Sequence, residues 1–367
     1  MLKSEVHIVL IWEKGLNKLN HILHDLKNSF DILDVIRINW DERFFSSNLS
    51  RFYGQNLPDR SFKEKHCGKG PFVSIVVRQS KPIYEIRKTS KGKFLVNTLL
   101  FDKKQLYRNW TGGGHKIHTS NDMKESMRDI FLLLNKKIED YDDSDIWDEN
   151  IRELDINIQG FSGWKDFDEL FNFINTSSQY LILRNYKNIK SIFRNPDCSD
   201  IDFLTSDRDF MYSINGIKKH NNRSRAAYAI KVANNSYNID IRLANDKYYD
   251  FKWACNMMES KILYKNKFFI PNPENEFYSL LYHTLIHKKY LSEKYSNELL
   301  NLSKIIGLKI NASTFRDREK SFSILNKFLN DKNYQITRPE DYSVQYTYGY
   351  RGFKRFFWEL IGKAKNV

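Results

Sequence analysis

Three aspartates in the second half of the chain carry the chemistry that the sequence predicts. Asp200 and Asp202 alternate with apolar residues in Ser199–Leu204 (SDIDFL), a pattern typical of a β-strand. Side chains two positions apart on a strand point to the same face, roughly 6.5 to 7 Å apart. Two carboxylates at that separation repel each other unless a cation lies between them. Mg²⁺ suits such a pair, because it binds a few carboxylates together with phosphate oxygens and water.

A third carboxylate, Asp240, lies in a second alternating segment, Tyr237–Arg242. The paired aspartates alone are a weak signal, and a third one about a hairpin further on strengthens it. If the two strands lie side by side, three carboxylates converge. Such a cluster can hold metal ions that polarise a phosphoryl centre and neutralise a leaving phosphate or pyrophosphate.

A glycine-rich basic loop, Thr111–Asn121, is the second candidate site. Glycines let backbone amides approach an anion, and the Asp122/Glu125 capping-box spacing predicts a helix whose N-terminus adds positive charge. The loop matches neither a Walker motif nor the dinucleotide-binding spacing. The alternative interpretation is a surface loop with ordinary helix capping. We expect a second phosphate or nucleotide site there, formed by Gly113, Gly114, His115, Lys116 and His118.

Periodicity predicts the elements that must position these residues. The first half is predicted to be α/β, with helices at 16–26 and from 123 onward and strands at 6–12, 32–38, 72–77, 83–87 and 94–98. The second half is predicted to form a small mixed sheet followed by helices. Its expected elements are a helix at 164–174, strands at 180–184, 200–205, 226–232 and 237–243, and a helix at 274–288.

The second half resembles the nucleotidyltransferase fold over roughly residues 160 to 300. It is similar to bacterial nucleotidyltransferase-like proteins of surface-polysaccharide clusters, distant relatives of the fukutin-type and choline-phosphate transferases. The motifs that carry the resemblance are Tyr180–Lys187, Ser199–Leu204, Ile239–Arg242, Tyr248–Asp250 with Trp253, and Phe277–His283 with Lys288 and Tyr295. Where the superfamily usually has a glycine pair, this chain has Arg184 and Asn185, which weighs against simple nucleoside-monophosphate transfer.

The resemblance implies that Asp200 and Asp202 bind Mg²⁺ or Mn²⁺, with Asp240 as a third ligand or a general base. Arg184 is expected to bind a substrate phosphate. Arg242 either binds a phosphate or forms a salt bridge to Asp240.

The predicted helix at 274–288 ends in further candidates. Lys288, with Lys289 beside it, is expected to contact a substrate phosphate. His283 and His287 lie one helical turn apart, so they either form a metal-binding pair or belong to a packed helix face.

Composition sets the class and the domain boundaries. The chain has 367 residues and a net charge of +14, which favours polyanionic partners. Three distant cysteines indicate neither a disulfide scaffold nor a structural zinc site. We predict an α/β (α+β) chain: an α/β domain at 1–140, an acidic linker at 141–157, a nucleotidyltransferase-like domain at 158–345 and an amphipathic C-terminal helix at 346–367.

The predicted C-terminal helix carries one aromatic face flanked by arginines and lysines. That composition is typical of a helix lying on anionic lipid; the alternative is a helix docked on the domain's own core. No apolar run is long enough to span a membrane, and the first residues do not form a signal peptide. We therefore expect a cytoplasmic protein, with a peripheral position on the inner face of the plasma membrane if the helix binds lipid.

The predicted function is metal-dependent transfer of a phospho-alditol or sugar phosphate. The donor would be nucleotide-activated, preferably CDP-linked, and the acceptor a lipid-linked glycan in the synthesis of capsule, O-antigen or a teichoic-acid-like polymer. One alternative is a true nucleotidyltransferase that adds NMP to a sugar phosphate, a small molecule or a protein. A non-enzymatic nucleic-acid-binding protein is the second alternative, disfavoured because no recognised motif is present.

Overall fold

A computed structural model describes residues 4–89, 92–142, 144–188, 200–219, 223–289 and 291–348. It confirms the predicted mixed α/β class. The chain forms two compact units: unit 1 holds Met1–Ser177, Asp209–Asn215 and Lys231–Asn234, and unit 2 holds the rest. No helix of the described residues is long and apolar enough to cross a membrane. The helix predicted at 346–367 falls almost entirely outside the described residues.

Unit 1 is built on a five-stranded sheet in the order β6-β1-β3-β2-β7. β3 lies between β1 and β2 and is antiparallel to both, while β7 is parallel to β2. Every residue of β3 is buried, so the centre of the sheet is covered on both faces. The strands are β1 (Glu5–Ile11), β2 (Asp31–Asn39), β3 (Phe72–Gln79), β6 (Ile117–Thr119) and β7 (Arg152–Asp155).

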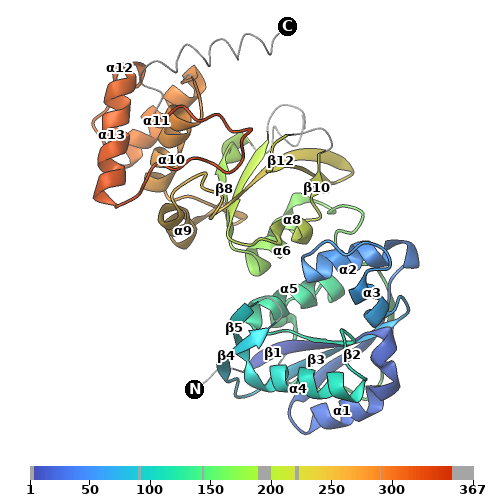
Figure 1. The fold of residues 1–367 in the computed structure, drawn as a ribbon. Coiled ribbons are helices and arrows are strands. Elements are labelled where there is room, and N and C mark those ends of the chain that lie inside the picture. The colour runs from blue at the N-terminus through green and yellow to red at the C-terminus, as the bar shows by residue number, and fades with distance from the viewer. Residues whose placement is uncertain are drawn as a thin grey trace. The chain divides into compact units, whose positions relative to one another are not determined.

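Helices cover both faces of this sheet (Figure 1). α1 (Leu19–Lys27) and α4 (Thr98–Trp110) lie on one face, where their apolar side chains join those of β1 and β3 in a single core. An aromatic cluster forms a second core of this unit: Trp12, Trp40, Phe45, Phe52 and Phe72. The remaining helices of the unit are α2 (Phe45–Tyr53), α3 (Phe62–Cys67), α5 (Met123–Leu134), α6 (Phe167–Ser177) and α8 (Phe210–Ser213).

Unit 2 is built on a second five-stranded sheet, in the order β10-β11-β12-β9-β8. β9 is parallel to β12 and antiparallel to β8, so the sheet is mixed, as the sequence predicts. The strands are β8 (Tyr180–Arg184), β9 (Ile201–Thr205), β10 (Ile217–Lys218), β11 (Ala227–Val232) and β12 (Asn235–Leu243). A short hairpin, β13 (Ile262–Tyr264) with β14 (Phe268–Ile270), lies next to β8.

The helices of unit 2 follow the sheet in sequence and gather in one group (Figure 1). Side-chain caps start most of them: Asn272, for example, accepts from the Asn275 amide, and Pro273 occupies the first helical position. One apolar core joins these helices to β8 and β9. They are α9 (Phe251–Glu259), α10 (Pro273–Ile286), α11 (Glu293–Ile305), α12 (Ala312–Arg316) and α13 (Arg318–Asp331).

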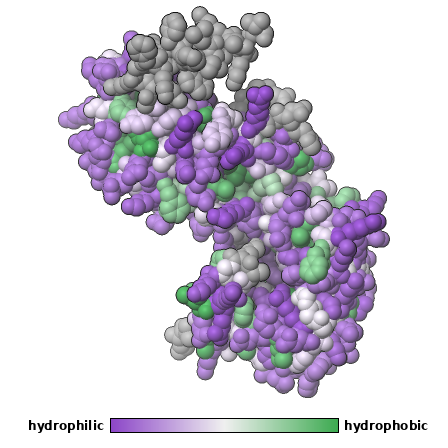
Figure 2. All heavy atoms as spheres, viewed as in Figure 1, coloured by the Kyte–Doolittle hydropathy of each residue, from purple (hydrophilic) through white to green (hydrophobic). Residues whose placement is uncertain are grey.

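The division between the units falls after Ser177, whereas the predicted linker is 141–157. The acidic segment is not a free connection, because β7 within it pairs with β2. α6, expected to open the second domain, packs against α5 in unit 1. The visible surface is mainly hydrophilic, with apolar residues in small separate groups (Figure 2).

Candidate active site

Three charged residues form a row across neighbouring strands of the second sheet. Arg184 on β8 is the register partner of Asp202 on β9, and Asp202 is the register partner of Asp240 on β12. Register partners on adjacent strands lie about 5 Å apart and project to one face. The predicted convergence of Asp202 and Asp240 is therefore present in the backbone, while Asp200 lies one residue before β9 begins.

A β-bulge brings Arg184 into this row. The register of β8 against β9 shifts between Ile182 and Arg184, so Arg184 pairs with Asp202 at the place where Leu183 would otherwise stand. Asn185 follows with a φ of 64°, in the left-handed region. Asparagine tolerates this conformation better than most residues, and glycine adopts it freely. Asn185 therefore adopts the left-handed turn that a glycine would also adopt at this position.

Two arginines neutralise the two carboxylates of the row, of which Asp202 is buried and Asp240 half-buried. The Arg184 guanidinium donates to Asp202 Oδ1 at 2.8 Å. Arg242 donates to Asp240 Oδ2 at 3.2 Å and to Asp341 Oδ2 at 3.0 Å. The predicted salt bridge to Asp240 is therefore present. Arg242 also lines the pocket, so phosphate binding by this residue stays a prediction. Burial lowers the pKa of Arg184, but Asp202, Tyr248 and Tyr249 outweigh that effect and raise it.

Burial first, and neighbouring carboxylates after it, raise the pKa values of Asp200 and Asp240. Burial, and then the neighbouring Asp202, raise the pKa of Asp200, although Lys219 acts against them. Burial also raises the pKa of Asp240; Arg242 opposes this, and Asp202 and Asp200 add to it. A group of carboxylates with raised pKa values favours a bound cation, because the cation stabilises their charged forms.

The donor set fits a divalent cation of the Mg²⁺ type, with side-chain movement. One oxygen each of Asp202 and Asp240 is bonded to an arginine, and the Asp200 side chain makes no hydrogen bond with the described residues. The oxygens of these three aspartates do not all lie within 4.8 Å of one another. Among the described residues, His118, Glu125 and Asp129 of unit 1 bring potential metal-ligand atoms that close together. A cation at the row would therefore draw the aspartates together against their arginine partners.

A pocket of about 510 Å³ opens over this row. Lys219 and Lys288 reach it from outside the strands that carry the row, together with Tyr248 and Tyr295. The structure thus brings together nearly every residue that the second half was predicted to contribute: Arg184, Asp200, Asp202, Asp240, Arg242, His283, His287 and Lys288. Cations and carboxylates on one wall can bind a phosphate together with its counter-ion.

The two histidines of this pocket differ in their hydrogen bonding. His283 Nδ1 is 2.8 Å from the Tyr248 hydroxyl, which also accepts from Arg184. His287 packs against Tyr248 at 4.0 Å between ring centroids, yet both of its ring nitrogens are buried without a partner among the described residues. Burial, and then Arg184, lower the pKa of both imidazoles, so each stays neutral. Their ring centroids are 5.8 Å apart, and the packed-face interpretation accounts for His283.

The glycine-rich loop belongs to unit 1, whereas the carboxylate pocket belongs to unit 2. It follows α4 and leads into β6, and α5 begins only at Met123. Its amides close the turn: Gly112 donates to Asn109 O, Gly113 to Arg108 O, and His115 to the imidazole of His66. Lys116 Nζ bonds Thr111 O. The predicted Asp122–Glu125 cap is confirmed, since Asp122 accepts from the Glu125 amide at 2.8 Å.

His118 is separated from the loop glycines because it points into the core of unit 1. Its Nε2 lies 2.8 Å from Asp129 Oδ2, and both side chains are buried. Burial lowers the pKa of His118 to about 3 and raises the pKa of Asp129 to about 7. With these pKa values His118 is neutral and Asp129 is protonated between about pH 4 and 6.5, so the two residues do not form an ion pair there. Burial also lowers the pKa of nearby Lys104, to about 8.

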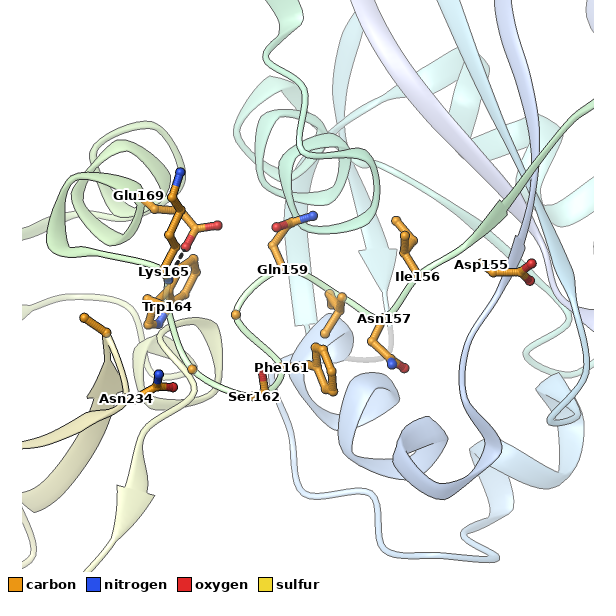
Figure 3. A pocket seen from close by; sticks show the side chains of 14 residues that line it. Asp155, Ile156, Asn157, Gln159, Phe161, Ser162, Trp164, Lys165, Glu169 and Asn234 are labelled. Atoms are coloured by element: carbon orange, nitrogen blue, oxygen red, sulfur yellow. Dashed lines mark hydrogen bonds between the residues drawn. The ribbon is translucent and has the colours of Figure 1, made fainter.

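A larger hollow of about 670 Å³ in unit 1 lacks comparable chemistry (Figure 3). It is lined by the 155–165 segment with Glu169, Ala233 and Asn234. Its acidic side chains have local partners: Glu169 accepts from the Lys165 amide and Asp155 accepts from Asn39. No described residue there offers a second carboxylate or a histidine beside them, so the carboxylate pocket is the better candidate.

Sequence reasoning missed two contributors to the pocket. Asp341 holds Arg242, and hydrogen bonds from Ser343, Ser224 and Arg242 lower the pKa of its carboxyl although burial opposes this. Lys219 faces Asp200 from the end of β10. Both come from segments without periodicity, so no sequence signal marked them.

Comparisons with known proteins add little to this geometry. No family model and no curated protein matches the chain. Among solved structures, nucleoside diphosphate kinase from Aquifex aeolicus aligns at 13% identity over 39% of this chain and 99% of its own, with a TM-score of 0.25. The Borrelia burgdorferi enzyme, with bound vanadate and ADP, aligns at 14% identity over 41% and 94%, with a TM-score of 0.24. At such TM-scores neither likeness bears on fold or function.

Proposed function

We propose that the carboxylate pocket of unit 2 transfers a phosphorus-containing group in a metal-dependent reaction. The observation that carries the proposal is the in-register row of Arg184, Asp202 and Asp240, with Asp200 beside it and lysines around it. The row joins anionic ligands for a cation to cationic ligands for a phosphate, and phosphoryl transfer needs both.

Each residue has a role that follows from its surroundings. Asp200 and Asp202 hold Mg²⁺ or Mn²⁺, which when bound neutralises charge on the donor's phosphates. Arg184, Arg242, Lys219 and Lys288 orient those phosphates. Asp240, with its raised pKa, accepts the proton of the acceptor hydroxyl as the new O–P bond forms and the bond to the leaving nucleotide breaks.

The donor we propose is a CDP-linked alditol or sugar, and the acceptor is a lipid-linked glycan of a bacterial surface polymer. This choice rests on the resemblance to proteins of surface-polysaccharide clusters. The runner-up is transfer of NMP itself. The Arg184–Asn185 turn weighs against the runner-up, because a side chain stands where the superfamily brings backbone close to phosphate. With such a donor and acceptor, we propose a cytoplasmic protein whose acceptor would reach it at the inner face of the plasma membrane.

A ligand screen tests the proposal. The purified protein is heated with CDP, CMP, UDP, ATP or CDP-ribitol, each with and without Mg²⁺, because a ligand that binds the folded state raises the melting temperature. We expect a Mg²⁺-dependent rise with cytidine nucleotides that is lost in Asp200→Asn/Asp202→Asn. Asp331→Asn, an exposed position at the end of α13, is the matched control and should respond like the wild type. A rise that persists in the double variant would contradict the assignment.

A further inference from the structure

The β4–β5 hairpin of unit 1 exposes an unusual group of apolar side chains. β4 (Tyr84–Thr89) and β5 (Gly92–Asn97) form their own two-stranded sheet (Figure 1). Most large apolar residues of the unit are buried, whereas four on or beside this hairpin are about half or more exposed: Ile83 60%, Ile86 69%, Phe94 49% and Leu95 59%. Two strands alone are marginally stable in water, so exposed apolar area here needs an explanation.

Register places Ile86 and Leu95 on one face of the hairpin and Phe94 on the other. Ile86 is the partner of Leu95, and the next pair on the same face is Lys88 with Lys93. Like charges directly opposite each other destabilise a strand pair. Neither lysine forms an ion pair with the described residues, and this face of the two strands carries no acidic residue. The hairpin's one acid, Glu85, is on the opposite face and pairs with Arg87 at 3.0 Å.

The base of the hairpin is fixed to the rest of unit 1. The Tyr84 hydroxyl donates to Glu5 at 2.8 Å, and the Asn97 side chain donates to Gln79 at 2.7 Å. Asn97 also accepts from the Leu100 amide and caps α4, while Val96 is fully buried. The exposed face is therefore held in place by polar contacts, of which the Asn97–Gln79 contact is buried and the Tyr84–Glu5 contact is half-buried.

We propose that this Ile86/Leu95/Lys88/Lys93 face docks on a membrane surface rich in anionic lipid. Aliphatic side chains gain by entering the boundary between headgroups and acyl chains, and lysines beside them extend to lipid phosphates. Charge complementarity selects this occupant: a neutral surface would leave the opposed lysines unpaired, and a nucleic-acid backbone would leave the aliphatic pair in water. The proposal does not depend on the carboxylate pocket.

Sedimentation of the full chain with vesicles tests the inference. Wild type is expected to bind vesicles of phosphatidylcholine mixed with phosphatidylglycerol, more weakly at high salt, and not phosphatidylcholine alone. Ile86→Ser/Leu95→Ser should weaken binding at least about tenfold, because two aliphatic side chains no longer gain by burial. Lys88→Gln/Lys93→Gln should weaken it by about fivefold for each lysine.

Matched controls lie on α11 of unit 2. Ile305→Ser removes an isoleucine that is 65% exposed, and Lys304→Gln removes a lysine next to it; both should bind like the wild type. All substituted positions are exposed, so circular dichroism should show unchanged folding. Unchanged vesicle affinity in Ile86→Ser/Leu95→Ser would overturn the proposal. Self-association of the wild type without lipid, lost in that variant, would also overturn it, since the face would then join two copies of the chain.

Discussion

The carboxylate row of unit 2 and the glycine-rich loop of unit 1 are both predicted to bind phosphate. The structure brings the predicted residues of the row together and separates those of the loop. In the row, Arg184, Asp202 and Asp240 come from three strands and meet on one face. In the loop, residues that are close in sequence lie in different surroundings. The amides of Gly112 and Gly113 donate to carbonyls at the end of α4, whereas the His118 side chain lies in the core of unit 1.

The difference shows which sequence patterns carry spatial information. Strand alternation fixes the face of each side chain, so three aspartates in two apolar strands predict a shared face once the strands pair. A cluster of glycines and cations fixes no direction. Its amides can serve an anion or the preceding helix, and here hydrogen bonds to the carbonyls of α4 use two of them.

The largest effect we expect separates Asp202, in the middle of the row, from Asp200 beside it. Asp202→Ala removes the partner of buried Arg184 and should lower the free energy of unfolding by about 3–5 kcal/mol, the cost of an uncompensated buried charge. Asp200→Ala removes an exposed carboxylate without a described hydrogen bond and should change it by less than about 0.5 kcal/mol. Urea denaturation measures both.

For ligand binding, in contrast to stability, we expect a large effect of the Asp200 substitution. Asp200→Ala is expected to abolish Mg²⁺-dependent nucleotide binding while the protein stays as stable as the wild type. If Asp200→Ala instead destabilises the fold as much as Asp202→Ala, Asp200 is a structural residue and the row is not a cation site.

The next prediction concerns pH and the His118–Asp129 pair. The pKa of folded His118 is about 3, below its ordinary 6.5. As pH falls, His118 of the unfolded state therefore takes up a proton first, and the free energy of unfolding decreases. The pKa of folded Asp129 is about 7, above its ordinary 3.8, so that its contribution is lost as pH rises. Between about pH 4 and 6.5 the folded and unfolded pairs each hold one proton, and the two effects offset.

Asp129→Asn should expose the contribution of His118 alone. Acidification from pH 6.5 to 4 should then cost the variant, relative to wild type, up to about 1.4 kcal/mol of unfolding free energy per pH unit. Urea denaturation at a series of pH values measures this. A variant whose stability differs from wild type by a constant amount across that range would contradict these protonation states.

Much of the fold follows from local patterns, and its long-range pairings do not. The predicted strand at 180–184 matches β8 residue for residue, because an apolar run between polar loops leaves little freedom. β7, by contrast, is Arg152–Asp155 (RELD), mostly exposed at the edge of the sheet. One apolar residue among three charged ones does not mark a strand, and β7 is held in the sheet by its pairing with β2, which is distant in sequence.

A smaller effect tests whether the loop glycines bind phosphate or shape a turn. Gly113 has a φ of 82° with open space around its Cα, so Gly113→Ala should cost about 1–2 kcal/mol in backbone strain alone. If the turn is structural, ATP affinity of the folded variant stays at the wild-type value. A large loss of ATP affinity, measured calorimetrically, would mean that the loop binds phosphate. The loop and the row would then no longer differ in this respect.

The smallest effect compares the two pocket histidines. His287→Phe replaces two unpartnered buried nitrogens with an apolar ring, so stability should stay equal or rise. His283→Phe breaks the bond to Tyr248 and should cost about 1 kcal/mol or more. Thermal unfolding measures both. Equal destabilisation would mean that His287 has a polar partner, and its place in the pocket wall would need revision.

The site was predictable to the extent that it lies on regular strands. Asp200, Asp202, Asp240, Arg184 and Arg242 were all found from alternation and resemblance, and they line one pocket. The bulge at Leu183 and the reach of Asp341 from an irregular segment were not predictable, because neither has a local pattern. Asp129 did leave a signal: an acid on the apolar face of α5, among Ser126, Ile130 and Leu133.

Binding of Mn²⁺ tests the central claim most directly. Electron paramagnetic resonance counts free Mn²⁺ during titration of the wild type, Asp200→Asn and the control Asp331→Asn, each with CDP present. The account predicts bound Mn²⁺ in the wild type and the control, and at least about tenfold weaker binding when the Asp200 carboxylate is lost. Equal Mn²⁺ affinity in all three proteins would contradict it and would leave the row as a set of structural salt bridges.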